Sequence, residues 1–254
     1  MASKDQVAAP LGFLAVEVDI ARPPGDPYNE HTWSFPLIRE TVRNTAVSSL
    51  VTDVPYEDSF LDGFVAAGLK LAERGAVGIM TSCGFLALAQ KRYVNTKLDP
   101  SFTPQASQAH AAAGFRIPSL CSMLPPAASV GIMTYDATRL NDKHLRELDI
   151  DITRIKISGA PAEGHLQAFV TQTEPLDARR LESEIIQQAR MLVANHPDVA
   201  CIVLECTNMG PHGEAVQKAT GLPVYDVYTL GEWFYAGLRR RNPRTWSEKT
   251  QAQL

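Results

Sequence analysis

The sequence has little charge imbalance and no long apolar run, and each absence excludes a class of protein. Its 254 residues carry 24 Lys and Arg against 28 Asp and Glu, so nothing in the composition favours a polyanion-binding protein. No apolar stretch approaches the roughly 18 residues that a membrane-spanning helix needs. The first residues lack the apolar segment of a secretory signal. We therefore expect a cytoplasmic protein that binds neither nucleic acid nor membrane.

Cysteine is scarce, and its spacing excludes the common metal sites. The chain has four, Cys83, Cys121, Cys201 and Cys206, with no Cys-x-x-Cys pair and no clustered Cys and His. This spacing disfavours zinc, and a cytoplasmic location favours thiols over disulfides. We expect no metal and no cofactor, and thiol chemistry is admissible.

Two segments share one pattern, an amphipathic helix followed by a buried strand that ends in a cysteine. The helix predicted over 57–74 precedes an apolar run that leads to Cys83. The helix predicted over 177–195 precedes a second apolar run, which leads to Cys206. Ligand crevices of open α/β sheets lie beyond the carboxyl ends of the strands. We therefore predict that both thiols lie in one cleft, on opposite sides of it.

Predicted strands and helices alternate along the chain, which is typical of parallel α/β sheets. Strands are expected over 11–19, 49–54, 75–81 and 116–121, then, after a break near Pro125, over 129–134, 152–158, 198–205 and 222–227. Further helices are expected over 35–44, 85–93, 105–114, 141–148, 213–220 and 229–240. This order predicts two similar α/β lobes with a cleft between them.

Two thiols that face each other suit proton transfer at a carbon atom. One thiolate removes a proton, and the opposite thiol delivers a proton to the other face. A helix start after each strand-end cysteine is expected to lower the thiol pKa. Cys201 lies in the middle of a strand and Cys121 lacks the repeated context, so both are interpreted as core residues.

The segments Thr81-Ser-Cys83-Gly-Phe and Leu204-Glu-Cys206-Thr-Asn-Met-Gly-Pro, with Arg22-Pro-Pro-Gly-Asp26, resemble the aspartate/glutamate/hydantoin racemase superfamily. The resemblance covers nearly the whole chain. It implies α/β architecture in two pseudo-symmetric Rossmann- or flavodoxin-like lobes, with parallel sheets and an active-site cleft between them. Residues 1–120 with about 222–254 are expected to form the first lobe, and about 121–221 the second.

The resemblance also implies cofactor-independent chemistry with Cys83 and Cys206 as the catalytic acid and base. Donors beside the cysteines, a residue of the loop after the first strand, and the end of the fifth strand are expected to bind the substrate. These residues are Ser82, Gly84, Thr207, Asn208, Asp26, Thr134 and Tyr135. Glu205 is expected to face away from the site, and His212 to lie near the cleft or in solvent.

The expected function is a racemase or epimerase that inverts a carbon next to a carboxylate or carbonyl. Its substrate would be an amino acid, a hydantoin or a related small acid. Gly84-Phe85 and Thr207-Asn208 depart from the residues that amino-acid racemases have there, which puts glutamate itself in doubt. The alternatives are a cysteine-dependent isomerase or decarboxylase of small dicarboxylic acids, and a binding protein for small anions. A homo-oligomer is also open.

Overall fold

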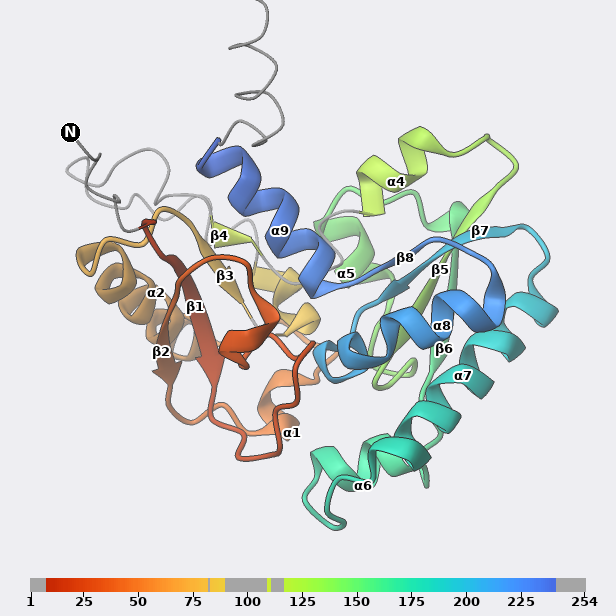
Figure 1. Cartoon of the computed structure of the whole chain (residues 1–254), viewed down its shortest axis with the longest axis horizontal. Coiled ribbons are helices and arrows are strands. Elements are labelled where there is room, and N and C mark those ends of the chain that lie inside the picture. The colour runs from red at the N-terminus through yellow and green to blue at the C-terminus, as the bar shows by residue number, and fades with distance from the viewer. Residues whose placement is uncertain (1–7, 82, 90–108, 111–116, 241–254) are drawn as a thin grey trace, which may run out of the picture.

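Two parallel sheets, each of four strands, form the cores of two lobes (Figure 1). The computed structural model describes residues 8–81, 83–89, 109–110 and 117–240. The strand order is β2-β1-β3-β4 in the first sheet and β6-β5-β7-β8 in the second. Counted within each lobe, both orders run second, first, third, fourth, which is the flavodoxin-like arrangement. The predicted α/β fold with two pseudo-symmetric lobes is confirmed.

The first lobe is built around β1, whose residues are all buried because helices cover both faces of its sheet. Its strands are β1 (Leu11–Val16), β2 (Leu37–Val42), β3 (Ile79–Thr81) and β4 (Ala109–His110). Its helices are η1 (Glu30–Thr32), α1 (Val47–Leu50), α2 (Asp58–Glu73) and η2 (Gly84–Ala89). Leu14 of β1 packs with α2 on one face, and Phe13 packs with α9 (Val227–Leu238) on the other.

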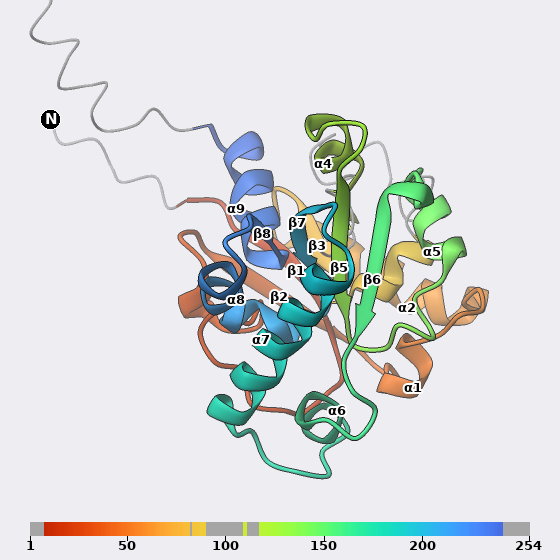
Figure 2. The same ribbon diagram turned by 90° about the vertical axis from the view of Figure 1, so that its right-hand side faces the viewer.

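The second lobe repeats this plan around β5. Its strands are β5 (Ser129–Thr134), β6 (Ile155–Gly159), β7 (Val199–Leu204) and β8 (Val224–Tyr225). Its helices are α4 (Ile117–Met123), α5 (Asp142–Glu147), η4 (Ile152–Arg154), α6 (His165–Val170), α7 (Ala178–Asn195), η5 (Thr207–His212) and α8 (Gly213–Thr220). In the side view of Figure 2, α7 and α8 lie on one face of the sheet and α5 lies on the other.

The chain returns to the first lobe at its last helix. β8 pairs with β7 and completes the second sheet, whereas α9 packs on the first sheet through Leu230 and Phe234. Asp226 lies at the crossing and caps α9, because its side chain accepts from the backbone N–H of Thr229 at 2.9 Å. The chain therefore returns to the first lobe after Tyr225.

Several predicted elements of the lobes are wrong. The segment expected as a helix over 35–44 forms β2, an edge strand in which the charged residues Arg39 and Glu40 interrupt the apolar run. The strand expected over 49–54 is replaced by the short helix α1. The strand expected over 116–121 is α4, which begins with Ile-Pro, a favourable helix start. Within 105–114, where a helix was expected, the two described residues form β4.

None of the helices in the described ranges combines the length and the apolar character required to cross a bilayer.

Candidate active site

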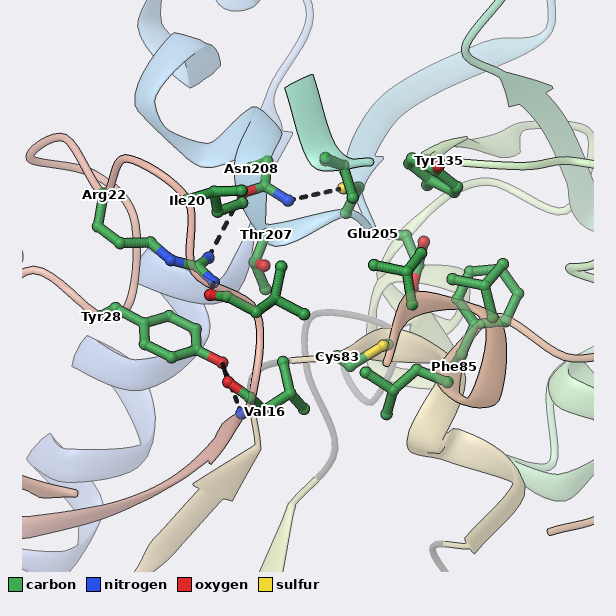
Figure 3. A pocket seen from close by; sticks show the side chains of 17 residues that line it. Val16, Ile20, Arg22, Tyr28, Cys83, Phe85, Tyr135, Glu205, Thr207 and Asn208 are labelled. Atoms are coloured by element: carbon green, nitrogen blue, oxygen red, sulfur yellow. Dashed lines mark hydrogen bonds between the residues drawn. The ribbon is translucent and has the colours of Figure 1, made fainter. Parts of the chain in front are cut away.

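A cavity lies between the lobes, at the carboxyl ends of four strands. Val16 ends β1, Cys83 follows β3, Tyr135 follows β5 and Cys206 follows β7, and all four line the cavity (Figure 3). Parallel strands bring their carboxyl ends to one edge of each sheet, and the two edges face each other here. The prediction that both thiols lie in one cleft is therefore confirmed geometrically.

Each of the two thiols lies at the start of a 3-10 helix and is half-buried. Backbone N–H groups of Phe85 and Leu86 donate toward the sulfur of Cys83. Cys206 is the N-cap of η5, and the side-chain amide of Asn208 donates to its sulfur at 3.8 Å. Both thiols therefore have donors that would stabilise a thiolate.

The expectation of a lowered thiol pKa is nevertheless wrong. Burial is the main cause that raises the pKa of Cys83 far above its ordinary value, and the negative charge of Glu205 raises it further. The same two causes raise the pKa of Cys206 to about 12. The helix-start donors act in the expected direction, but desolvation and the neighbouring carboxylate outweigh them. Both groups are therefore thiols at neutral pH.

Glu205 lies in the cavity wall, although the sequence interpretation directs it to the opposite face. Glu205 is 4% exposed, and the hydroxyl of Thr134 donates a hydrogen bond to its Oε2 at 2.6 Å. Strand alternation does not separate it from Cys206, because β7 ends at Leu204 and the chain turns there. The carboxylate fills the space beside Gly84 in which a Cβ would lie. Burial raises the pKa of Glu205 to about 7, against the lowering effect of the Thr134 hydrogen bond.

Arg22, in the loop after β1, brings a cation to the cavity, and sequence reasoning missed it as a site residue. Its guanidinium lies over the ring of Tyr28, 3.8 Å from the ring centroid, and forms an ion pair with Asp26 at 3.2 Å. It also donates to the carbonyl of Val18 at 3.0 Å and to Oδ1 of Asn208 at 3.5 Å. The only sequence signal was the density of Pro, Gly and Asp in this loop.

The remaining predicted site residues divide into two groups. Gly84, Tyr135, Thr207 and Asn208 line the cavity together with the two cysteines. Asp26 and Thr134 are buried behind it, where they position Arg22 and Glu205 respectively. Ser82 lies outside the described residues.

Three other candidates lie away from the cavity. Cys121 and Cys201 are buried in the core of the second lobe, as predicted. His212 is buried beside a second cavity, where its Nδ1 lies 3.3 Å from a carboxylate oxygen of Glu182.

The rest of the cavity wall is apolar. It is formed by Val16, Val18, Ile20, Val47, Leu50, Val51, Phe85 and Val170, together with the ring of Tyr28. Among the described residues, no group of three or more His, Cys, Asp and Glu side chains could hold a metal ion. The site therefore combines two thiols, one cationic side chain, one buried carboxyl group and an apolar wall. These groups can bind a small carboxylate and move a proton at a neighbouring carbon.

Solved structures of low sequence identity share this architecture. An arylmalonate decarboxylase superposes with a TM-score of 0.56 at 13% identity, over 90% of this chain and 91% of that one. The aspartate racemase of Picrophilus torridus gives 0.51 at 12% identity, over 94% of this chain and 98% of that one. The allantoin racemase of Klebsiella pneumoniae gives 0.53 at 12% identity, over 89% and 86%. The chain has the fold of the aspartate/glutamate/hydantoin racemase superfamily.

That fold carries both racemases and a decarboxylase, so it does not select one reaction. No model of a known protein family matches the chain.

Curated relatives found by sequence similarity are named as lyases, and not as racemases or decarboxylases. A dimethylsulfoniopropionate lyase of Durusdinium sp. clade D is 30% identical over 178 residues, 68% of this chain and 56% of the relative. Dimethylsulfoniopropionate lyase 5 of Emiliania huxleyi is 24% identical over 227 residues, 89% of this chain and 45% of the relative. The chain thus spans about half the length of these two relatives.

Proposed function

We propose that this chain is a cofactor-independent enzyme that removes a proton from the carbon next to a carboxylate, with Cys83 and Cys206 as its acid–base groups. We further propose that the reaction is a lyase reaction, in which a leaving group departs from the next carbon. The observation that carries the proposal is the convergence of both thiols and the Arg22 guanidinium on one cavity.

The substrate carboxylate binds at the Arg22 end of the cavity. A guanidinium presents N–H donors in a fork that matches a carboxylate. Thr207 and Asn208 line the wall beside it and add a hydroxyl and an amide. Positive charge at this end also stabilises the negative charge that develops on the carboxylate when the neighbouring carbon loses its proton.

The names of the curated relatives support elimination as the outcome. Dimethylsulfoniopropionate is a propionate with a dimethylsulfonium group on the carbon beyond the α-carbon. A thiolate takes the α-proton, the C–H electrons form the new carbon–carbon double bond, and the carbon–sulfur bond breaks with its electrons on sulfur. The products are acrylate, neutral dimethyl sulfide and one proton, which passes from the thiol to solvent. This step needs no oxidant and no reductant.

The apolar wall suits the same class of substrate. Seven of the residues that line the cavity are valine, leucine or isoleucine. Two methyl groups on sulfur can pack against such a wall, because transfer of methyl surface out of water is favourable. A second carboxylate or a polar ring would have to lose water there without gaining enough hydrogen bonds.

A racemase or epimerase is the second candidate, and the second thiol favours it. Elimination needs only one base, whereas inversion needs an acid on the opposite face of the substrate carbon. Cys83 and Cys206 come from different lobes and line the cavity from its two sides. An acid without a leaving group would then exchange its α-proton and invert.

Proton NMR in heavy water distinguishes the candidates. The protein is incubated separately with dimethylsulfoniopropionate, with amino acids and with substituted hydantoins. Appearance of acrylate and dimethyl sulfide, lost in Cys83→Ala or Cys206→Ala, is the result expected for the lyase. Deuterium uptake with inversion, and no acrylate, would replace it with the racemase. Absence of both reactions with every compound would overturn the proposal that these thiols perform acid–base catalysis.

A further inference from the structure

We propose that Glu205 is a specificity-determining residue that binds a positively charged group on the β-carbon of the substrate, so that the cavity selects zwitterionic acids. The expected ligands are small carboxylates that carry a sulfonium or a quaternary ammonium group. The inference rests on the proposed function, because it assumes that Arg22 binds the substrate carboxylate.

The two charged groups of the cavity lie on opposite sides of it. Figure 3 shows the Arg22 guanidinium on one side, and Glu205 with Tyr135 and Phe85 on the other. Arg22 and Glu205 are the only Lys, Arg, Asp or Glu residues among those described that line this cavity. A zwitterion with its carboxylate at Arg22 would therefore direct its cationic end to Glu205, past the thiol of Cys83.

Glu205 is a buried carboxyl group without a cationic partner among the described residues. Within the described ranges, no Lys, Arg or His forms an ion pair with it, whereas Arg22 is paired with Asp26. In the described part of the chain, the hydrogen bond to its carboxylate comes from the hydroxyl of Thr134, a neutral donor. A buried carboxylate without a counter-charge is costly. A cationic substrate supplies that charge, and an uncharged one does not.

The carboxylate cannot withdraw from the site. It occupies the position of the missing side chain at Gly84, and Thr134 fixes its other oxygen from β5. The rings of Tyr135 and Phe85 line the same side of the cavity. Aromatic faces attract sulfonium and quaternary ammonium groups, so they complement the carboxylate as a site for a methylated cation.

Binding of a cation also changes the thiols. Cys83 and Cys206 are the titratable groups that interact with Glu205, and its negative charge raises the pKa of each. A cationic substrate group beside Glu205 offsets that charge, so a thiolate forms more readily in the substrate complex than in the free protein. The base is thereby produced where the correct substrate is bound, and the resting thiols stay protonated.

The test compares pairs of ligands that have the same shape and differ in charge. One pair is dimethylsulfoniopropionate and isocaproate, in which carbon replaces the sulfonium sulfur. The other is β-alanine betaine and its analogue with a tert-butyl group in place of trimethylammonium. All proteins in this test carry Cys83→Ala, which suppresses turnover. Dissociation constants are measured by calorimetry for Cys83→Ala alone, for Cys83→Ala with Glu205→Gln, and for Cys83→Ala with Glu182→Gln. Glu182 lies on α7 and does not line this cavity.

We expect the protein that retains Glu205 to bind each cationic ligand more tightly than its uncharged isostere. The difference in dissociation constant should be roughly tenfold to a hundredfold, as for a desolvated charge pair. Glu205→Gln should lose most of that preference. It should retain its affinity for isocaproate, which would show that the variant is folded. Glu182→Gln should keep the preference. As a second readout, β-alanine betaine should raise the ultraviolet thiolate absorbance of Cys206 in the Glu205 protein and leave it unchanged in Glu205→Gln.

Equal binding of both members of each pair by the Glu205 protein would overturn the inference. So would a preference that survives in Glu205→Gln. Because binding is measured without turnover, these results are independent of the proposed reaction. Release of dimethyl sulfide by the wild-type protein together with equal binding would retain the lyase and reject the role of Glu205. A charge preference without any turnover would reject the lyase and retain the cation site.

Discussion

The guanidinium of Arg22 donates to Oδ1 of Asn208 at 3.5 Å, and this contact joins the two lobes at the site. Asn208 in turn donates to the sulfur of Cys206 at 3.8 Å. The loop after β1 also packs on η5, because Gly25 has so little room that an added Cβ would lie 2.7 Å from the Cα of Pro211. Arg22 is thus held by both lobes, at the place where a substrate carboxylate would displace or extend its contact with Asn208.

Substitution of Arg22 is predicted to weaken substrate binding more than it slows chemistry. Arg22→Leu should raise KM by roughly a hundredfold and Arg22→Lys by roughly tenfold, because a lysine keeps the charge and loses the fork of donors. Steady-state kinetics measures both. Arg179→Leu, at the second cavity, is the matched control and should leave KM unchanged. An unaltered KM in Arg22→Leu would place the carboxylate elsewhere.

Loss of either cavity thiol is predicted to abolish turnover, whereas loss of a core thiol is not. Cys83→Ala and Cys206→Ala should each lower kcat by roughly a hundredfold or more, the usual contribution of one positioned acid or base. Cys121→Ala is the matched control, since Cys121 is buried in the second lobe and does not line the cavity. Full activity in a cavity variant would show that the substituted thiol is not one of the acid–base groups.

The cavity thiols are predicted to react slowly with iodoacetamide at neutral pH. Burial and the charge of Glu205 raise the pKa of Cys206 to about 12, so the thiolate fraction should grow with pH throughout the alkaline range. Glu205→Gln removes the negative charge, lowers both thiol pKa values and should accelerate alkylation at about pH 8. Mass spectrometry of each cysteine peptide gives the rates. An alkylation rate that already reaches its plateau near neutral pH would contradict the raised thiol pKa.

Glu205 is also predicted to make the fold less stable as the pH rises. Its folded pKa is about 7 against an ordinary value of 4.5, so the folded state holds the proton more tightly than the unfolded state. The stabilising contribution is therefore complete below about pH 4.5 and is lost as the pH rises through about 7, by up to about 3 kcal/mol. Urea unfolding of the wild type and of Glu205→Gln across this range measures the difference. A constant difference would rule out the raised pKa.

Local sequence patterns predicted the framework of the site because the decisive forces there are local. The runs before Cys83 and Cys206 are apolar over the length of a buried strand, and amphipathic helices precede them. The core positions of Cys121 and Cys201 followed from their spacing and context. Edge elements were harder to predict, since Arg39 and Glu40 interrupt β2, which lacks the continuous apolar run of a central strand.

The sequence by itself determined that this is a two-lobed α/β protein with a cysteine at a strand end in each lobe, because hydrophobic periodicity and turn residues act over short distances. Only the tertiary structure decided that Arg22 reaches the cavity and that Glu205 faces it beside Gly84. It also decided the direction of the thiol pKa shifts. Those outcomes depend on burial and on charges from distant parts of the chain, and no local pattern records either.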